Sequence, residues 1–140
     1  MINFNRHPKV GFVASCFDLL HAGHCLMLKD AKNHCDYLVA ALQTDPTIDR
    51  PDTKNKPILS LEERKILLES NKYVDEIIEY STEQDLNRIL EKLLPDVRIL
   101  GSDYKGRVAT GTLYSNKIYY HDRNHDYSTT NIRKKILNTK

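Results

Sequence analysis

The 140-residue chain lacks the features that mark secreted, membrane-spanning and disulfide-rich proteins. Its cysteines are Cys16, Cys25 and Cys35, an odd number without a C-x-x-C pair. No apolar run approaches the roughly 20 residues that a membrane span needs, and residues 1–7 contain no apolar stretch of the kind found in signal peptides. These absences predict a cytoplasmic protein with reduced thiols and no membrane partner.

The net charge is small as well, at +2, but the charges are unevenly distributed. Residues 57–96 carry five Lys or Arg and ten Asp or Glu, whereas residues 117–140 carry six Lys or Arg and two Asp. The basic run Arg133-Lys134-Lys135 would suit a nucleic-acid binder. The low net charge and the lack of an aromatic platform beside that run instead predict that nucleic acid is not a partner.

Length and composition predict one globular domain over residues 1–140. Forty per cent of the residues are hydrophobic and 29% are charged, which is typical of a soluble protein and argues against disorder. A domain of this size buries roughly 68% of the surface of its unfolded chain, so one sizeable core is possible.

Hydrophobic patterning predicts alternating strands and helices. Residues 10–14 and 37–42 are apolar runs of strand length, which is typical of parallel strands covered on both faces. The last helix should bury Ile132 and Ile136. We predict an α/β protein, a three-layer α/β/α sandwich with a Rossmann-like, mostly parallel five-stranded sheet. The expected strands are 10–14, 37–42, 76–80, 97–100 and 117–120; the expected helices are 22–33, 60–70, one from Ser81 or Thr82 to Leu93, and 128–137.

Three polar segments directly follow predicted strands. They are residues 15–24, the long loop 43–57, and residues 123–130. Because ligands of open parallel sheets bind beyond the carboxyl ends of the strands, we expect these segments to meet at one edge.

The first segment places His21 and His24 three residues apart at the start of a helix. Gly23 between them allows close approach of a ligand, and the free N–H groups of a helix start favour an anion. Two imidazoles could donate hydrogen bonds to phosphate oxygens. Two alternatives stay open: both histidines are ordinary surface or core residues, or they form a zinc site with Cys25.

The other two segments add cations and a second helix start. The loop contributes Arg50, Lys54 and Lys56, which could close over phosphates or simply be solvated. Arg123 could hold a phosphate with both ends of its guanidinium, and Ser128 could cap the last helix. Together the segments predict a polyphosphate site, although neither G-x-x-x-x-G-K-[ST] nor G-x-G-x-x-G occurs in the chain.

Two motifs resemble those of the nucleotidylyltransferase superfamily. Phe17-Asp18-Leu19-Leu20-His21-Ala22-Gly23-His24 resembles its H-x-G-H signature, and residues 123–130 resemble its R-x-x-x-x-S-T-T signature. The chain is most similar to small cytidylyltransferases of the glycerol-3-phosphate type. Residues 94–105 are equally similar to the heptose-phosphate adenylyltransferases.

The resemblance implies a reaction in which a phosphorylated polyol or sugar takes CMP from CTP and pyrophosphate is released. A phosphate monoester has a second pKa near 6, so the attacking oxygen is already ionised at neutral pH and no general base is needed. Two alternatives are adenylyl transfer from ATP to a sugar phosphate and a catalytically weak nucleotide-binding protein. Mg²⁺ bridging the phosphates, with no set of protein ligands of its own, and a homodimer are also implied, with the tyrosines of residues 114–120 as an exposed interface.

The resemblance also assigns roles to individual residues. Arg64 matches an arginine of the family's second helix, Lys72 replaces a family arginine, and Ser15-Cys16 replaces Gly-Thr. Arg88 is the nearest cation to the acceptor-binding lysine of the cytidylyltransferases. The implied catalytic residues are His21, His24, Lys54, Lys56, Arg123 and Ser128; the nucleotide-binding residues are Ser15, Cys16, Phe17, His21, Gly23, His24, Arg64, Lys72, Asp103, Arg123, Tyr127, Ser128, Thr129 and Thr130; the acceptor-binding residues are Asp18, Lys54 and Arg88.

Overall fold

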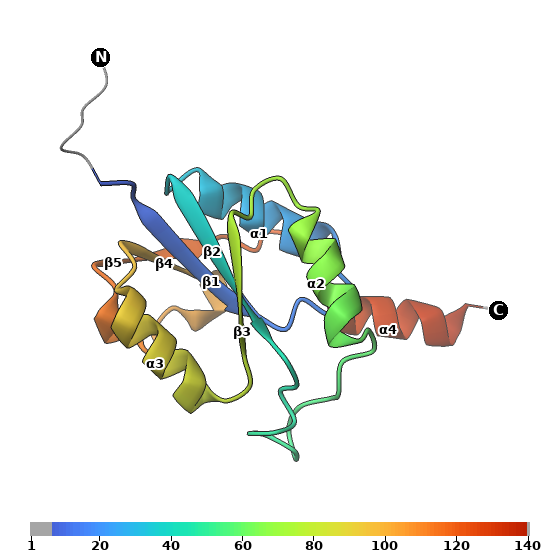
Figure 1. The fold of residues 1–140 in the computed structure, drawn as a ribbon. Coiled ribbons are helices and arrows are strands. Elements are labelled where there is room, and N and C mark those ends of the chain that lie inside the picture. The colour runs from blue at the N-terminus through green and yellow to red at the C-terminus, as the bar shows by residue number, and fades with distance from the viewer. Residues whose placement is uncertain (1–6, 140) are drawn as a thin grey trace.

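The computed structural model describes residues 7–139, which form a parallel sheet flanked by helices (Figure 1). The strands lie in the order β3-β2-β1-β4-β5, and every neighbouring pair is parallel. The predicted α/β sandwich with five strands is therefore confirmed. The elements are β1 (Val10–Ser15), α1 (Ala22–Lys32), β2 (Tyr37–Gln43), α2 (Leu61–Glu69), β3 (Glu76–Tyr80), α3 (Glu83–Leu93), β4 (Val97–Gly101), β5 (Lys117–His121) and α4 (Thr129–Asn138).

The central strands are apolar throughout because helices cover both of their faces. On one face, Leu28 of α1 and Leu68 of α2 pack with Val13 of β1 in a fully buried cluster. On the other face, Leu86 and Leu90 of α3 pack with Phe12 of β1 and Tyr80 of β3 in a second cluster. Figure 1 shows α3 on the opposite side of the strands from α1 and α2.

The strand order creates a crevice at the carboxyl ends of β1 and β4. From β1 the chain goes outward to β2 and β3, then returns to the other side of β1 for β4 and β5. The loops that follow β1 and β4 therefore diverge to opposite sides, which is where parallel sheets bind ligands.

Side-chain caps fix where the helices begin. Ser60 and Glu63 form a capping box at α2, and Ser128 accepts the N–H of Asn131 at the start of α4. At α3 the cap is Thr82, which accepts the N–H of Asp85. These contacts satisfy N–H groups that a helix start leaves without partners.

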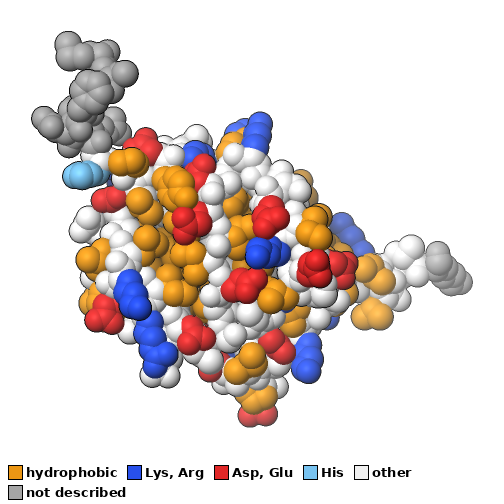
Figure 2. Space-filling view, in the orientation of Figure 1, with side chains coloured by type: hydrophobic (Ala, Val, Ile, Leu, Met, Phe, Trp, Pro, Cys, Tyr) orange, Lys and Arg blue, Asp and Glu red, His pale blue; other side chains and the backbone are white. Residues whose placement is uncertain are grey.

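Two expectations about the exposure of side chains are wrong. Ile132 is only partly buried and Ile136 is 62% exposed, because α4 extends away from the sheet and has no element to pack against at its far end (Figure 1). Figure 2 shows hydrophobic side chains exposed there. The tyrosines of residues 114–120 are partly buried rather than exposed; the hydroxyl of Tyr119, for example, donates to Asp30 at 3.0 Å. No helix among residues 7–139 is both long and apolar enough to span a membrane.

Candidate active site

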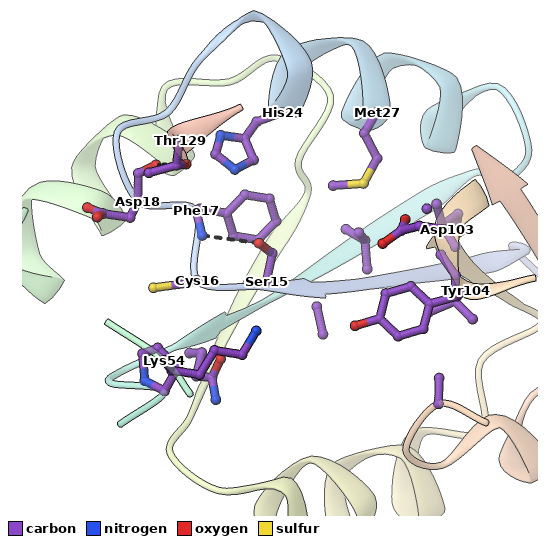
Figure 3. Close-up of a pocket in the computed structure, with 18 of the residues that line it drawn as sticks. Ser15, Cys16, Phe17, Asp18, His24, Met27, Lys54, Asp103, Tyr104 and Thr129 are labelled. Atoms are coloured by element: carbon purple, nitrogen blue, oxygen red, sulfur yellow. Dashed lines mark hydrogen bonds between the residues drawn. The ribbon is translucent and has the colours of Figure 1, made fainter. Parts of the chain in front are cut away.

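A pocket of about 760 Å³ lies at the carboxyl edge of the sheet (Figure 3). Its wall is formed by the ends of all five strands and by the starts of α1, α3 and α4. The three polar segments that follow strands in the sequence do meet here. The predicted site residues that line it are Ser15, Cys16, Phe17, Asp18, His21, Gly23, His24, Lys54, Asp103, Arg123, Thr129 and Thr130.

The turn between β1 and α1 has an unusual backbone. Phe17 and Leu19 have φ values of 50° and 52°, in the left-handed region that non-glycine residues rarely adopt. Phe17 is only 1% exposed, and its N–H donates to Oγ of Ser15 at 3.2 Å (Figure 3). Packing of the Phe17 ring thus holds a backbone that costs free energy, a feature common at functional sites.

Asp18 lies in the same turn and anchors the long loop. One carboxylate oxygen accepts the N–H of Ile58 at 2.8 Å and the other accepts that of Leu59 at 3.0 Å. Arg133 of α4 lies 3.5 Å from the first oxygen. Asp18 therefore lines the pocket as expected, but both of its oxygens already bind the protein's own groups.

His21 and His24 cap their own helix. Nδ1 of His21 accepts the N–H of Gly23 at 3.0 Å, and Nδ1 of His24 accepts the N–H of His21 at 3.2 Å. The two rings stack with their centroids 3.8 Å apart. Because each Nδ1 accepts a hydrogen bond, the proton of each neutral ring is on Nε2, which can donate to a ligand.

Burial keeps both rings neutral. It lowers the pKa of His24 from 6.5 to about 3, with smaller contributions from His21 and Arg123. Burial likewise lowers the pKa of His21, with further effects of Arg123 and His125. At neutral pH the pair consists of two uncharged N–H donors, and neither ring is free to take up a proton without losing its cap.

The starts of α1 and α4 are in close contact. Thr129 donates its hydroxyl to the carbonyl of Asp18 at 3.0 Å. A Cβ added to Gly23 would lie 2.9 Å from the carbonyl oxygen of Tyr127, so only glycine allows this approach. Two helix starts with unpaired N–H groups thus converge on one space, which favours an anion there.

The pocket wall has an excess of positive charge. Asp18, Glu83 and Asp103 are each within 3.5 Å of one arginine. Six cationic and three anionic side chains line the pocket, which suits a polyanion. The cations are Arg50, Lys54, Arg98, Arg107, Arg123 and Arg133.

The pocket extends to the α3 side of the sheet as a lobe lined by Arg50, Arg98, Tyr104 and Thr110, which was not predicted from the sequence. Arg98 is its main cation: it is 3% exposed and donates to the carbonyl of Thr110 at 2.6 Å. No carboxylate among residues 7–139 lies within 4 Å of it. Thr110 in turn donates to Glu83, which pairs with Arg50 at 2.6 Å. An arginine inside the apolar run 97–100 was the signal that could have revealed this lobe.

Six expected site residues do not line this pocket. Lys72 precedes β3 and so lies at the opposite, amino edge of the sheet, where it covers the ring of Tyr73. Arg88 is on the exposed side of α3 beside Asp85. Ser128 is used as a helix cap. The others are Lys56, Tyr127 and Arg64.

Arg64 is a structural residue. It is 2% exposed, and its guanidinium donates to four backbone carbonyls: those of Cys16, Gln43, Thr44 and Leu59, at 3.0, 2.6, 2.6 and 3.2 Å. It therefore ties α2 to the loops that follow β1 and β2, behind the pocket rather than in it.

Replacing Arg64 should destabilise the fold. Arg64→Met removes the donors to four part-buried carbonyls, so we expect the free energy of unfolding to fall by roughly 3 kcal/mol. Urea denaturation measures this loss. The control is Lys65→Met: Lys65 lies 3.7 Å from Glu79, both about half exposed, and its loss should cost under about 0.5 kcal/mol. Equal effects of the two substitutions would contradict the role of Arg64.

The protonation state of the histidine pair can be tested by NMR in nucleotide-free protein. The ¹⁵N shifts of His24 should show a neutral Nε2–H ring from pH 8 down to about pH 4.5, because its pKa is about 3. The unfolded chain takes up this proton near pH 6.5, so stability should also fall as the pH drops from 6.5 towards 3. Titration of His24 near pH 6.5 would disprove the buried, capped pair.

Comparison with known proteins identifies the relatives of this chain. A family model described as Cytidylyltransferase-like matches residues 12–135. The bifunctional protein HldE of Campylobacter concisus is 35% identical over 94% of the chain, and that of Helicobacter pylori is 33% identical over 96%. The chain spans only 28% and 29% of the length of these two proteins.

Solved structures share the fold. A lipopolysaccharide core biosynthesis protein from Thermoplasma volcanium superposes with a TM-score of 0.60 at 24% identity, covering 94% of this chain and 88% of its own. Pantoate-β-alanine ligase from Francisella tularensis superposes with a TM-score of 0.61 at 18% identity, covering 90% and 65%. Because the family model covers residues 12–135, nearly the whole chain, the chain belongs to the cytidylyltransferase-like family of nucleotidyltransferases.

Proposed function

We propose that the protein transfers AMP from ATP to a phosphorylated sugar and releases pyrophosphate. The observation that carries the proposal is the pair of neutral histidines at the start of α1, which lies beside the start of α4 in the wall of a pocket with excess positive charge. This arrangement suits the phosphates of a nucleotide, because it offers N–H donors and cations but no unengaged pair of carboxylates.

The relatives favour ATP over CTP as the nucleotide. HldE proteins take part in the synthesis of ADP-heptose, a process that includes adenylyl transfer from ATP. The sequence motifs favour CTP, and transfer of CMP is the second candidate because the family itself is described as cytidylyltransferase-like. As this chain matches less than a third of each HldE protein, only the nucleotidyl transfer step is proposed for it.

The chemistry consists of aligning two anions and stabilising charge. The ionised phosphate oxygen of the acceptor attacks the α-phosphorus of ATP, the bond from that phosphorus to the bridging oxygen breaks, and pyrophosphate leaves with the electron pair. The Nε2–H groups of His21 and His24 donate to phosphate oxygens as negative charge develops on them. Thr129, Thr130 and Arg123 hold the leaving pyrophosphate, and Lys54 approaches from the long loop.

Magnesium fits this site as an ion that enters with the nucleotide. Both oxygens of Asp18 accept backbone N–H groups, and Asp103 lies 3.5 Å from Arg123. Among residues 7–139, no group of three or more His, Cys, Asp or Glu side chains is placed to hold a metal. Phosphate oxygens would therefore supply most of the ligands, and bound Mg²⁺ would offset charge on the departing pyrophosphate.

The acceptor occupies the lobe on the α3 side. Arg98 and Arg50 offer positive charge there, and Thr110 and Tyr104 offer hydroxyl groups. Arg98, rather than the expected Arg88, would bind the acceptor. The side chain of Arg88 is 64% exposed and lies outside the pocket.

Pyrophosphate release tests the proposed reaction. The protein is incubated with Mg²⁺, each of the four nucleoside triphosphates and a panel of sugar and polyol phosphates. We expect release with ATP and a sugar phosphate. Release only with CTP would favour the second candidate, and no release with any combination would leave a nucleotide-binding protein without this activity.

A histidine variant tests the mechanism in the same assay. His24→Ala should lower turnover by at least about 10²-fold, because it removes a donor to the charge that develops in the transition state. His34→Ala is the matched control, since His34 follows α1 at the other end and lies outside the pocket. Near-normal turnover of His24→Ala would remove that residue from the mechanism.

A further inference from the structure

His121 ends β5 in the wall of the pocket, and among residues 7–139 only one of its ring nitrogens has a partner. The residue is 6% exposed. Its Nδ1 lies 2.8 Å from a carboxylate oxygen of Asp30 in α1, and the Tyr119 hydroxyl donates to the same oxygen at 3.0 Å. Its Nε2 is buried without a hydrogen-bond partner among residues 7–139. A buried polar atom in a pocket wall calls for a partner, and a ligand can provide it.

Asp30 determines whether Nε2 of His121 can donate or accept a hydrogen bond. A carboxylate can only accept hydrogen bonds, so the proton of the neutral His121 ring is on Nδ1 and Nε2 carries a lone pair. This is the reverse of the histidine pair at the start of α1, whose Nε2 atoms are donors. His121 therefore suits an N–H donor and disfavours a phosphate oxygen.

The wall near His121 combines apolar side chains with the Asp103–Arg123 ion pair, whose atoms lie close to Gly101. Gly101, its partner across β4 and β5, lines the pocket together with Ile99 and Met27. In Figure 3, Met27 and Asp103 border the hollow on the side away from Thr129, whose helix start is suited to phosphate. A nucleotide with its phosphates at the helix starts would thus place its base on the Met27 side.

We propose that Nε2 of His121 accepts a hydrogen bond from the exocyclic amino group of the nucleotide's base, and that Asp30 is the positioning residue that keeps Nε2 an acceptor. The inference rests on the proposed function, because it takes the ligand to be a nucleoside triphosphate. Adenine and cytosine carry an amino group on this edge, whereas guanine and uracil carry a carbonyl oxygen. His121 therefore selects amino bases over keto bases.

Binding measurements without an acceptor test the inference separately from catalysis. Calorimetry with Mg²⁺ gives dissociation constants for ATP, GTP, CTP and UTP. The wild type should bind ATP about tenfold more tightly than GTP, and CTP about tenfold more tightly than UTP. This is the difference expected when an amino base makes one buried hydrogen bond and a keto base cannot. In His121→Phe both ratios should fall to about 1, through weaker binding of ATP and CTP.

Two further variants separate recognition from loss of structure. Asp30→Asn keeps the His121 ring but can donate as well as accept, so it should reduce both ratios even if His121→Phe folds poorly. His34→Phe is the control, because His34 lies 3.6 Å from the same carboxylate but outside the pocket. It should keep the wild-type ratios.

The outcomes distinguish this inference from the proposed function. Loss of the ratios in His121→Phe and Asp30→Asn, but not in His34→Phe, supports the inference. Wild-type protein that binds all four nucleotides equally, or variants that keep the preference, would overturn it and leave the transfer reaction standing. Failure of every nucleotide to bind would overturn both proposals.

Discussion

The Nδ1 atoms of His21 and His24 each accept a backbone N–H at the start of α1, and the chemistry of the pocket depends on these two hydrogen bonds. They fix the tautomer of both rings, and burial keeps both uncharged at neutral pH. The same residues thus begin a helix and present two donors beside its free N–H groups. Gly23 between them lets the start of α4 approach within contact distance, which adds a second set of donors.

The small net charge of the chain conceals a pocket with a positive excess. Many of the acidic residues of 57–96 are on the exposed parts of α2, β3 and α3, whereas arginines from five different segments line the pocket. Three of them pair with carboxylates, which holds them in place before any ligand arrives. Arg98 has no such partner within the described residues 7–139, and its burial beside Thr110 makes it the group with most to gain from an anion.

Much of the fold could be predicted because its signals are local. Apolar runs located the five strands, and Ser60 and Ser128 located helix starts. The placement of both motifs after strands correctly predicted that they share one edge. Lys72 could have been excluded on the same ground, since it precedes a strand, but resemblance to a family motif outweighed its position.

The remaining wrong predictions concern residues whose roles depend on tertiary contacts that the sequence does not show. Arg64 sits on the inward face of α2, and only the packing of that helix against two loops shows that its guanidinium binds carbonyls. Ile136 has core-like spacing in a helix that extends past the core. Arg98 and His121 are polar residues in strands, and their significance depends on partners far away in the sequence, Thr110 and Asp30.

The most direct test of this account is a crystal structure with Mg²⁺ and a non-hydrolysable ATP analogue. It should show phosphate oxygens within hydrogen-bonding distance of Nε2 of His21 and His24 and of the first N–H groups of α4, with both Nδ1 atoms still bound to the backbone of α1. Phosphates bound elsewhere, or imidazole rings turned so that Nδ1 faces them, would contradict it.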